Sequence, residues 1–337
     1  MFNFAGKFTF FYCYKKMKQK SLIFLITLVI AFPTCIHAGN LEKIAFGDFN
    51  SWVIREIKES SIIGGNTKTL YEIGPNKTIK GDIPYTNEGG SPWGTSNVMA
   101  KVVGITKCSN AVFKDSRSAG NNCVKMTTIL ESVKALGLIN MKVLVSGSIF
   151  LGEMIEPISS TKNPYSKMEM GIPFSKRPTH LVFDYKVSVP TDNKMIYSSG
   201  FGSQKKLNGG DNAEVFIILQ RRWEDSDGNI HAMRVGTGRQ RYNKSTADWI
   251  NGHKIEVLYG NITQRSDYKS YMGLIPQDRS YYARNSKGKM VPIVEEGWDN
   301  ENATPTHMLI MASSGCGTAY TGTVGMTLWV DNMALQY

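Results

Sequence analysis

The sequence of 337 residues lacks every short motif that would identify a chemistry directly. It contains no glycine-rich phosphate-binding loop, no cysteine and histidine spacing typical of a zinc site, and no nucleophile motif with a convincing base. Helix-forming runs are also few, whereas glycine is frequent at 32 residues. The chain therefore shows no sign of a nucleotide-binding or zinc-dependent protein, and its composition favours a fold with many turns.

Long apolar runs are also missing, apart from one near the N-terminus. Ser21–Phe32 is a run of twelve residues dominated by apolar side chains, whereas a membrane-spanning helix needs about 20. A lysine-rich stretch precedes this run, Pro33 ends it, and Ala38 provides a cleavage site before Gly39. We therefore expect residues 1–38 to be an N-terminal extension and signal peptide, with Met17 as the better start. The chain would then be exported to the periplasm, the cell surface or the extracellular space, with no stable membrane span after cleavage.

Positive charge is not gathered into a stripe along the chain. Residues 1–38 contain five lysines and no acidic residue, so their removal lowers the formal net charge from +11 to +6. This mild excess is spread over about 300 residues, and no basic cluster with interleaved aromatic residues is present. We therefore expect no nucleic-acid partner.

Cysteine is scarce, and only Cys108, Cys123 and Cys316 follow residue 38. Exported proteins can form disulfides, and Cys108 and Cys123 flank a polar segment that could close into a loop. Such a closure would contribute roughly 3 kcal/mol in the chain-entropy model. Two shielded free thiols are the alternative, and the sequence leaves both open.

Alternating apolar and polar residues predict strands along most of the chain. In Gly171–Val187 a glycine and two prolines form a turn, after which Leu181, Phe183, Tyr185 and Val187 share one side of a strand. Many such strands separated by short turns predict an all-β fold, an antiparallel β-sandwich that is jelly-roll-like and resembles carbohydrate-binding modules. The only helical segment that we expect is a short one within residues 131–140. No linker or repeat divides residues 39–337, which we expect to form a single domain.

Several segments spread over this domain resemble one family. The chain is similar to the PCMD family, whose name stands for "putative carbohydrate metabolism domain" and which occurs in secreted and surface proteins of Bacteroidetes. The resemblance implies a sandwich fold and a role in handling sugars, and it leaves the activity open because fold does not fix function. The segments that carry the resemblance are Gly147–Gly152, Gly171–Val187, Tyr197–Gly202, Gln220–Trp223, Thr304–Met308 and Leu328–Leu335.

Aromatic residues in loops are the first candidates for sugar binding, because an aromatic ring covers the apolar face of a pyranose. Trp93, Trp298, Tyr281 and Tyr282 lie in segments rich in glycine, proline or asparagine, where a large ring has little structural role. The alternative for each is a loop residue that folds back onto the core. Tryptophans on predicted strands are expected in the core, namely Trp52, Trp223 and Trp329, whereas Trp249 is left undecided.

Polar residues on two predicted strands are the second group of candidates. Gln220 and Arg222 share a strand face with Glu214, and Asp184 lies on another strand. If these faces form the concave side of the sandwich, the four side chains line a groove. An ordinary solvated sheet face with ion pairs is the alternative, in which each pair contributes well under about 1 kcal/mol.

Catalysis would require two carboxylates on either side of a glycosidic bond. Asp184 and Glu214 are the pair that we would test first, with Glu153 and Glu156 as substitutes. A structural calcium ion is a further hypothesis for such a sandwich, with Asp48 and Asp331 as its ligands, because calcium prefers carboxylate oxygens. No other cofactor is expected.

The sequence thus leads to a secreted protein that recognises a glycan or polysaccharide through loop aromatics and a polar sheet face, and that is not an enzyme. The first alternative is a glycoside hydrolase or lyase that uses the paired carboxylates. The second is a structural or adhesive protein of the cell surface whose sheet edges pair with other subunits.

Overall fold

The computed structural model describes residues 40–337, apart from residues 103, 136–138, 161 and 201. This part of the chain is built from strands and contains no α-helix, so the predicted all-β fold is confirmed. Its only helical turns are four short 3-10 segments: η1 (Ser61–Ile63), η2 (Pro164–Lys167), η3 (Ser270–Met272) and η4 (Gln277–Arg279). No described helix is long and apolar enough to cross a membrane. The signal peptide expected in residues 1–38 lies outside the described residues.

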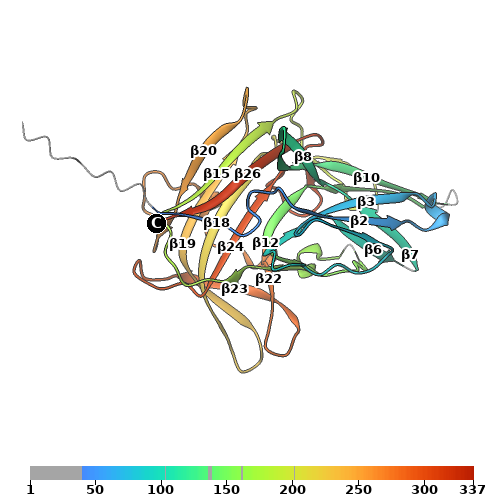
Figure 1. The fold of residues 1–337 in the computed structure, drawn as a ribbon. Helices are drawn as coiled ribbons and strands as arrows, with labels where there is room; N and C mark the ends of the chain where they lie inside the picture. Colours follow the sequence, from blue (N-terminus) through green and yellow to red (C-terminus); the bar gives the residue numbers. More distant parts are fainter. Residues whose placement is uncertain (1–39, 103, 136–138, 161, 201) are drawn as a thin grey trace, which may run out of the picture. The chain divides into compact units, whose positions relative to one another are not determined.

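One sheet of the sandwich has six antiparallel strands, several of which run side by side in Figure 1. Its order is β20-β15-β26-β9-β8, with β1 paired to β26 at one end. The apolar residues of β15 alternate as the sequence predicts, with Leu181, Phe183 and Val187 fully or almost fully buried. The strands are β1 (Leu41–Lys43), β8 (Val112–Ser118), β9 (Asn121–Thr127), β15 (His180–Ser188), β20 (Ile250–Glu256) and β26 (Thr327–Gln336).

The second sheet closes on itself. Following its pairings, β24-β18-β19-β23-β22-β13-β12 returns to β24, because β12 pairs with both β13 and β24. We call these seven strands the closed ring, and β5, β14 and β21 pair with them at its margins. The strands are β5 (Trp93–Thr95), β12 (Ser148–Met154), β13 (Met168–Met170), β14 (Ile172–Pro173), β18 (Ala213–Glu224), β19 (Ile230–Tyr242), β21 (Leu258–Tyr259), β22 (Tyr282–Arg284), β23 (Met290–Trp298) and β24 (His307–Ser313).

The two faces of β18 serve two separate apolar cores. Val215, Ile217 and Leu219 pack with the six-stranded sheet in the sandwich core. Phe216 and Ile218 point the other way, into the interior of the closed ring, where they pack with residues of β13, β22, β23 and β24. Burial on both faces explains the long apolar run of β18. The strand itself separates the inside of the ring from the sandwich core.

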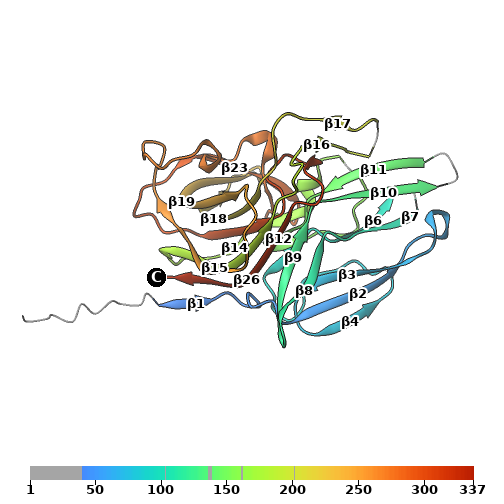
Figure 2. The same cartoon turned by 90° about the horizontal axis from the view of Figure 1, so that it is seen from above.

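Four smaller sheets complete the fold (Figure 2). The hairpin of β10 and β11 replaces the helical segment that we expected within residues 131–140, because β-branched and apolar residues on both sides of the turn pair in register. The strands are β2 (Trp52–Lys58), β3 (Thr67–Ile73), β4 (Lys77–Lys80), β6 (Val98–Val102), β7 (Ile105–Ser109), β10 (Ile129–Ala135), β11 (Ile139–Val145), β16 (Ile196–Tyr197), β17 (Lys205–Lys206) and β25 (Thr321–Gly322).

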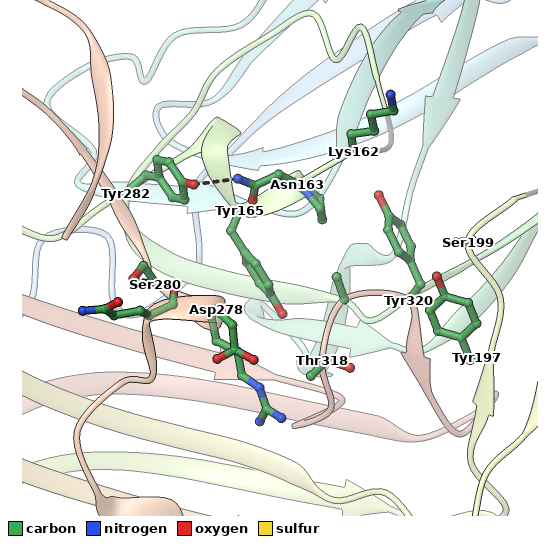
Figure 3. A pocket seen from close by; sticks show the side chains of 14 residues that line it. Lys162, Asn163, Tyr165, Tyr197, Ser199, Asp278, Ser280, Tyr282, Thr318 and Tyr320 are labelled. Atoms are coloured by element: carbon green, nitrogen blue, oxygen red, sulfur yellow. Dashed lines mark hydrogen bonds between the residues drawn. The ribbon is translucent and has the colours of Figure 1, made fainter. Parts of the chain in front are cut away.

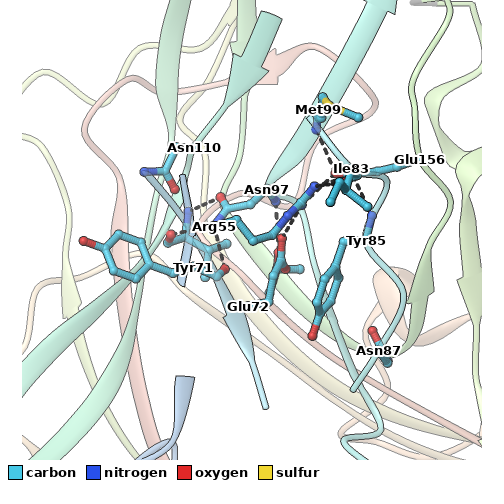
Figure 4. A network of polar contacts seen from close by, with 12 residues as sticks. Arg55, Tyr71, Glu72, Ile83, Tyr85, Asn87, Asn97, Met99, Asn110 and Glu156 are labelled. Atoms are coloured by element: carbon cyan, nitrogen blue, oxygen red, sulfur yellow. Dashed lines mark hydrogen bonds and ion pairs between the residues drawn. The ribbon is translucent and has the colours of Figure 1, made fainter. Parts of the chain in front are cut away.

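A buried network of charges joins β2 and β3 to the segment after β12 (Figure 4). The Arg55 guanidinium donates to Glu72 at 2.9 Å and to the Glu156 carboxylate at 2.6 and 3.0 Å. Thr95 donates to the other oxygen of Glu72 at 2.7 Å. Burial raises the pKa of Glu72 to about 7. One arginine thus serves two buried carboxylates, one of which is easily protonated.

The disulfide considered for Cys108 and Cys123 is wrong, because both side chains are buried free thiols. Cys108 lies on β7 and packs with Ile57, Leu70 and Met99, whereas Cys123 lies on β9 in the six-stranded sheet. Burial raises the pKa of both thiols to about 12. The polar segment between them is not a closed loop but forms β8 and its turn into β9.

Candidate functional site

A pocket of about 660 Å³ is lined by four tyrosines, and we call it the tyrosine pocket. Figure 3 shows the ring of Tyr165 lying between Tyr282 on one side and Tyr197 and Tyr320 on the other. The volume falls in the range of small-molecule sites. The remaining lining residues are mostly polar, namely Lys162, Asn163, Pro164, Ser199, Gln277, Asp278, Arg279, Ser280, Thr318 and Ala319.

Short local structures place these rings. Tyr165 belongs to η2, which Pro164 starts by fixing the backbone of its first residue. Tyr282 is on β22 and Tyr197 is on β16, which pairs with β25. Tyr320 precedes β25 and has a left-handed backbone with a φ of 64°. Such a conformation is costly for a bulky side chain, and strained residues of this kind cluster at functional sites.

The tyrosine pocket is anchored to the interior of the closed ring. Tyr165 packs edge-on against Tyr281, which in turn stacks on Phe216 of β18 with a centroid distance of 5.9 Å. Tyr281 is buried and belongs to the apolar core of the ring. The orientation of Tyr165 is therefore fixed by the core rather than by solvent.

Two phenols of the tyrosine pocket, those of Tyr165 and Tyr320, have raised pKa values and stay protonated at neutral pH. Burial raises the pKa of Tyr165, and it raises that of Tyr320 to about 12, with a further contribution from nearby Tyr197. Asn163 donates from Nδ2 to the hydroxyl of Tyr282 at 2.6 Å, and this contact fixes the Tyr282 ring at the rim. Protonated phenols can both donate and accept hydrogen bonds, as recognition of sugar hydroxyls requires.

Charges at the rim of the tyrosine pocket come from Lys162, Asp278 and Arg279, all of which are exposed. Asp278 is the single carboxylate among the described residues that line it. Hydrolysis of a glycosidic bond by the usual route takes two.

Only one of the four predicted aromatic platforms lies in this pocket, and it is Tyr282. Trp93 is completely buried against Phe49 and donates from Nε1 to the Ala45 carbonyl, so its prediction as a sugar platform is wrong. Tyr281 is also buried, beneath the pocket rather than in it. Glycine and proline around these rings mark tight turns that fold back onto the core.

Trp298 is half-buried at the end of β23 and lies apart from the pocket. Its ring packs against the small apolar cluster of Leu258, Ile262 and Met272. The Arg234 guanidinium lies 5.6 Å from the ring centroid on the inner side. Trp298 therefore packs on this apolar cluster and does not line the tyrosine pocket.

The groove and the catalytic pair expected for Asp184 and Glu214 are wrong, because the two residues lie on different sheets. Glu214 is buried inside the closed ring, where it accepts hydrogen bonds from Arg239 at 2.7 and 3.0 Å and from Arg241 at 2.6 Å. Asp184 is on the outer face of the six-stranded sheet, with the sandwich core between them. Alternation along each strand was predicted correctly, but it does not say which faces meet.

Gln220 and Arg222 also point into the closed ring rather than onto a groove. Gln220 is completely buried and donates to Glu295 at 2.7 Å, and its oxygen accepts from Arg222 Nε at 2.8 Å. Glu295 is held in turn by Arg234 at 2.5 and 2.7 Å. These side chains form a satisfied polar network at one end of the ring, and their assignment to ligand binding is not supported.

Asp184 instead lies opposite Asp331, its register partner on β26. Nη1 of Arg117 is 2.6 Å from an oxygen of each, so one guanidinium nitrogen bridges the two carboxylates and the two acids are close together. However, the Arg117 side chain fills the space between them and the Asp331 side chain is wholly buried. Trp249 covers the guanidinium at 4.4 Å. The cluster is therefore closed to a substrate.

The calcium site expected at Asp48 and Asp331 gains no support from these contacts. The Asp331 carboxylate is occupied by Arg117, Asn121 and the backbone N–H of Asn332. Asp48 accepts a local hydrogen bond from the Asn50 backbone in an exposed turn. In the described part of the chain, no group of three or more His, Cys, Asp or Glu side chains is placed to hold a metal ion.

The substitute acids also have structural partners. Glu156 is part of the buried Arg55 network, and Glu153 accepts a hydrogen bond from the Asn87 backbone at 3.0 Å. Neither lines the tyrosine pocket. Among the described residues, the structure thus brings no pair of the predicted acids together in an open site.

Tyr165, Tyr197 and Tyr320 were not among the residues predicted from the sequence. Two of them do lie in a segment rich in glycine, proline or asparagine, the criterion that selected Trp93. Tyr165 follows Asn163 and Pro164 in a polar turn, and Tyr320 lies in the glycine-rich segment after β24. Tyr197 gave no such signal, because it is on a short strand. The prediction for Trp223 was also wrong, because it is not a core residue but one of the exposed large hydrophobic residues.

Comparisons with known proteins agree with the sugar-related reading at the level of the family. The model of the family described as "Putative carbohydrate metabolism domain" (PCMD) matches residues 66–336. A comparison with curated proteins finds no match.

Two solved structures share low similarity with the chain. One is described as a putative glycoside hydrolase from Bacteroides thetaiotaomicron vpi-5482, with 16% identity over 80% of this chain and 75% of that chain and a TM-score of 0.44. The other is described as a putative glycoside hydrolase from Bacteroides vulgatus ATCC 8482, with 14% identity over 88% of this chain and 95% of that chain and a TM-score of 0.42. These scores are too low to support an argument about activity.

Proposed function

The chain belongs to the PCMD family, and from this premise we propose that it binds a glycan in the tyrosine pocket without cleaving it. Family membership associates the chain with carbohydrate metabolism. The single observation that supports binding at this place is a pocket of about 660 Å³ with four tyrosines and a largely polar remainder. Aromatic faces pack on the apolar side of a sugar ring, while hydroxyl and amide groups bond its hydroxyls.

The contacts within the pocket support a preformed site. Tyr165 is held from below by Tyr281, and Tyr282 is held at the rim by Asn163. A ligand that enters such a site does not have to order these rings, which reduces the entropic cost of binding. Export of the chain, which the sequence of residues 1–38 predicts, would place this site in contact with external polysaccharide.

A glycan array tests the proposal directly. Residues 39–337 should bind a defined set of glycans, and Tyr165→Ala should weaken that binding by about tenfold, which corresponds to about 1.4 kcal/mol. The matched control is Trp249→Ala, which removes a half-buried aromatic ring outside the pocket and should leave binding unchanged. Absence of binding to every glycan, or equal binding by the wild-type protein and Tyr165→Ala, would contradict the proposal.

Incubation of the bound oligosaccharides with the protein separates binding from hydrolysis. With one carboxylate at the described rim, we expect no new reducing ends after prolonged incubation. Their appearance, and their loss in Asp278→Asn, would instead establish a glycosidase at this site.

A further inference from the structure

Asp211 is a completely buried acid that does not line the tyrosine pocket. It lies just before the start of β18. In the described part of the chain, its carboxylate accepts hydrogen bonds from three backbone N–H groups and one thiol. A buried carboxylate is costly unless hydrogen bonds compensate for the lost water. The positions of these donors therefore indicate what the acid holds in place.

Three of the four donors belong to the two ends of one loop. Oδ1 of Asp211 accepts from the Cys316 backbone at 3.1 Å and from the Cys316 thiol at 3.5 Å. Oδ2 accepts from the Thr323 backbone at 3.3 Å. We call residues 316–323, which follow β24, the pocket loop. One carboxylate thus joins the first residue of this loop to the last.

The Asp211 backbone is itself held by Asn193. Oδ1 of Asn193 accepts from the Asp211 N–H at 2.9 Å and from the Thr323 hydroxyl at 2.8 Å. Nδ2 of Asn193 donates to the Asp211 carbonyl at 2.9 Å. Asp211 and Thr323 therefore share a second link, which keeps the carboxylate facing the loop.

Two glycines let the chain approach the Asp211 carboxylate closely. A Cβ atom at Gly315 would lie 2.8 Å from Oδ2, and one at Gly322 would lie 2.9 Å from the same oxygen. Because these distances are too short for a Cβ contact, only glycine fits here without a shift of the neighbouring atoms. The chain is therefore packed around this oxygen at both ends of the loop.

The pocket loop forms one wall of the tyrosine pocket through Thr318, Ala319 and Tyr320. The Thr318 carbonyl accepts from the Thr321 backbone at 3.0 Å and from the Thr321 hydroxyl at 2.6 Å, which closes a tight turn. Ala319 and Tyr320 are the central residues of this turn, and a positive φ at the third residue is common in such turns. The turn presents the Tyr320 ring, but its position depends on where the ends of the loop are held.

The pocket loop also positions Tyr197. This residue is on β16 and pairs with Thr321, and the backbone of the next residue, Ser198, donates to the Tyr320 carbonyl at 3.0 Å. Figure 3 shows Tyr197 and Tyr320 together on the side of the pocket opposite Tyr282. Two of the four tyrosines therefore depend on the same loop.

We propose that Asp211 is a positioning residue for glycan binding, because its carboxylate clamps both ends of the pocket loop and thereby holds the wall formed by Tyr320 and Tyr197. This inference rests on the proposed function and adds to it a residue that does not touch the glycan. When the clamp is released, the loop has to be ordered again as the sugar binds, and this cost lowers the affinity. The opposite wall, which includes Tyr165, is held by other contacts and should not change.

Asp211→Asn tests the clamp with little change in shape. The amide has one oxygen and one NH2 group, so an NH2 group faces at least one N–H donor that the carboxylate binds. Hydrogen exchange of residues 316–323, measured by mass spectrometry, should become at least about tenfold faster because the loop opens locally. Exchange of residues 280–284, on the opposite wall, should stay unchanged.

Calorimetric titration connects the clamp to binding. The probes are β-1,4-linked hexasaccharides of glucose, xylose, mannose and N-acetylglucosamine. Asp211→Asn should bind the best of these about tenfold more weakly than the wild-type protein does, as expected when an aromatic contact is no longer held in place. Gly322→Ala keeps the acid but puts a methyl group 2.9 Å from Oδ2, and it should change exchange and affinity in the same directions. This second variant carries the test if Asp211→Asn does not fold.

The matched control is Asp331→Asn, the same substitution at another wholly buried carboxylate, which pairs with Arg117 in the six-stranded sheet. It should lower the thermal midpoint but leave the exchange of residues 316–323 and the glycan affinity unchanged. Unchanged exchange in Asp211→Asn, faster exchange with unchanged affinity, or equal effects in the control would each overturn the role of Asp211 and leave the tyrosine pocket intact. Failure of the wild-type protein to bind any hexasaccharide would overturn the proposed function and this role with it.

Discussion

Tyr165 packs edge to face on Tyr281, with ring centroids 6.5 Å apart and an interplanar angle of 82°. The first ring lines the tyrosine pocket, and the second belongs to the apolar interior of the closed ring. The pair thus joins the proposed binding surface to the core. It also allows the contributions of binding and stability to be separated by mutation.

Tyr165→Ala should mainly affect glycan binding, whereas Tyr281→Ala should mainly affect stability. Tyr281→Ala opens a cavity in a packed interior and should lower the free energy of unfolding by about 3–5 kcal/mol. Tyr165→Ala should lower stability much less but weaken glycan binding by about tenfold. Urea denaturation measures the stability of the two variants, and calorimetric titration measures their glycan affinity. Equal losses of stability would show that Tyr165 stabilises the core as much as Tyr281 does.

The left-handed backbone of Tyr320 predicts an inverted order for two substitutions. At most positions glycine is less stable than alanine by roughly 0.5–1 kcal/mol. At a φ of 64° the alanine side chain is strained, so Tyr320→Gly should be more stable than Tyr320→Ala by about 1 kcal/mol. Both variants should lose glycan affinity. Thermal denaturation compares the stabilities of the two variants. If Tyr320→Ala were the more stable, the backbone would leave the left-handed conformation once the tyrosine ring is removed.

The alternation of apolar and polar residues predicted the strands and the fold class. It did not predict which distant segments contact each other. The alternation of Leu181, Phe183 and Val187 was enough to place β15 correctly. It could not show that Asp184 would lie opposite Asp331 rather than near Glu214, because strand pairing is decided by tertiary contacts. Likewise, the glycines and prolines around Trp93 indicated a turn but not that the turn folds inward.

The tyrosine pocket was even less accessible to sequence reasoning. Tyr165, Tyr197, Tyr282 and Tyr320 come from four segments of the chain, and only tertiary contacts bring them together. Trp223 shows the converse error. The first part of its strand is apolar and buried, but Arg221, Trp223 and Glu224 at the end of the strand are exposed.

Glu72 predicts a stability that falls as the pH rises. Its pKa is raised from the ordinary 4.5 to about 7 by burial, so the folded state binds a proton that the unfolded state releases. The corresponding stabilisation is complete below about pH 4.5 and is lost as the pH rises through 7. Glu72→Gln should abolish this dependence in thermal denaturation between pH 4.5 and 7. If stability fell with rising pH as steeply in the variant as in the wild-type protein, Glu72 would already be ionised beside Arg55 over this range.

Cys108 and Cys123 predict that oxidation state does not affect the fold. Because both are buried free thiols with raised pKa values, a reducing agent should not change the thermal midpoint of residues 39–337. The thiol reagent DTNB should react slowly with these two thiols in the native protein and fully after denaturation, because access to them requires unfolding. A midpoint that drops on reduction would reveal a disulfide after all.

The most direct test of the central claim is a crystal structure of residues 39–337 with the oligosaccharide that binds best on the array. The account predicts an intact sugar chain with one ring against Tyr165 and Tyr320 and hydrogen bonds to the polar rim of the tyrosine pocket. A sugar bound elsewhere, with the tyrosine pocket filled only by solvent, would contradict it.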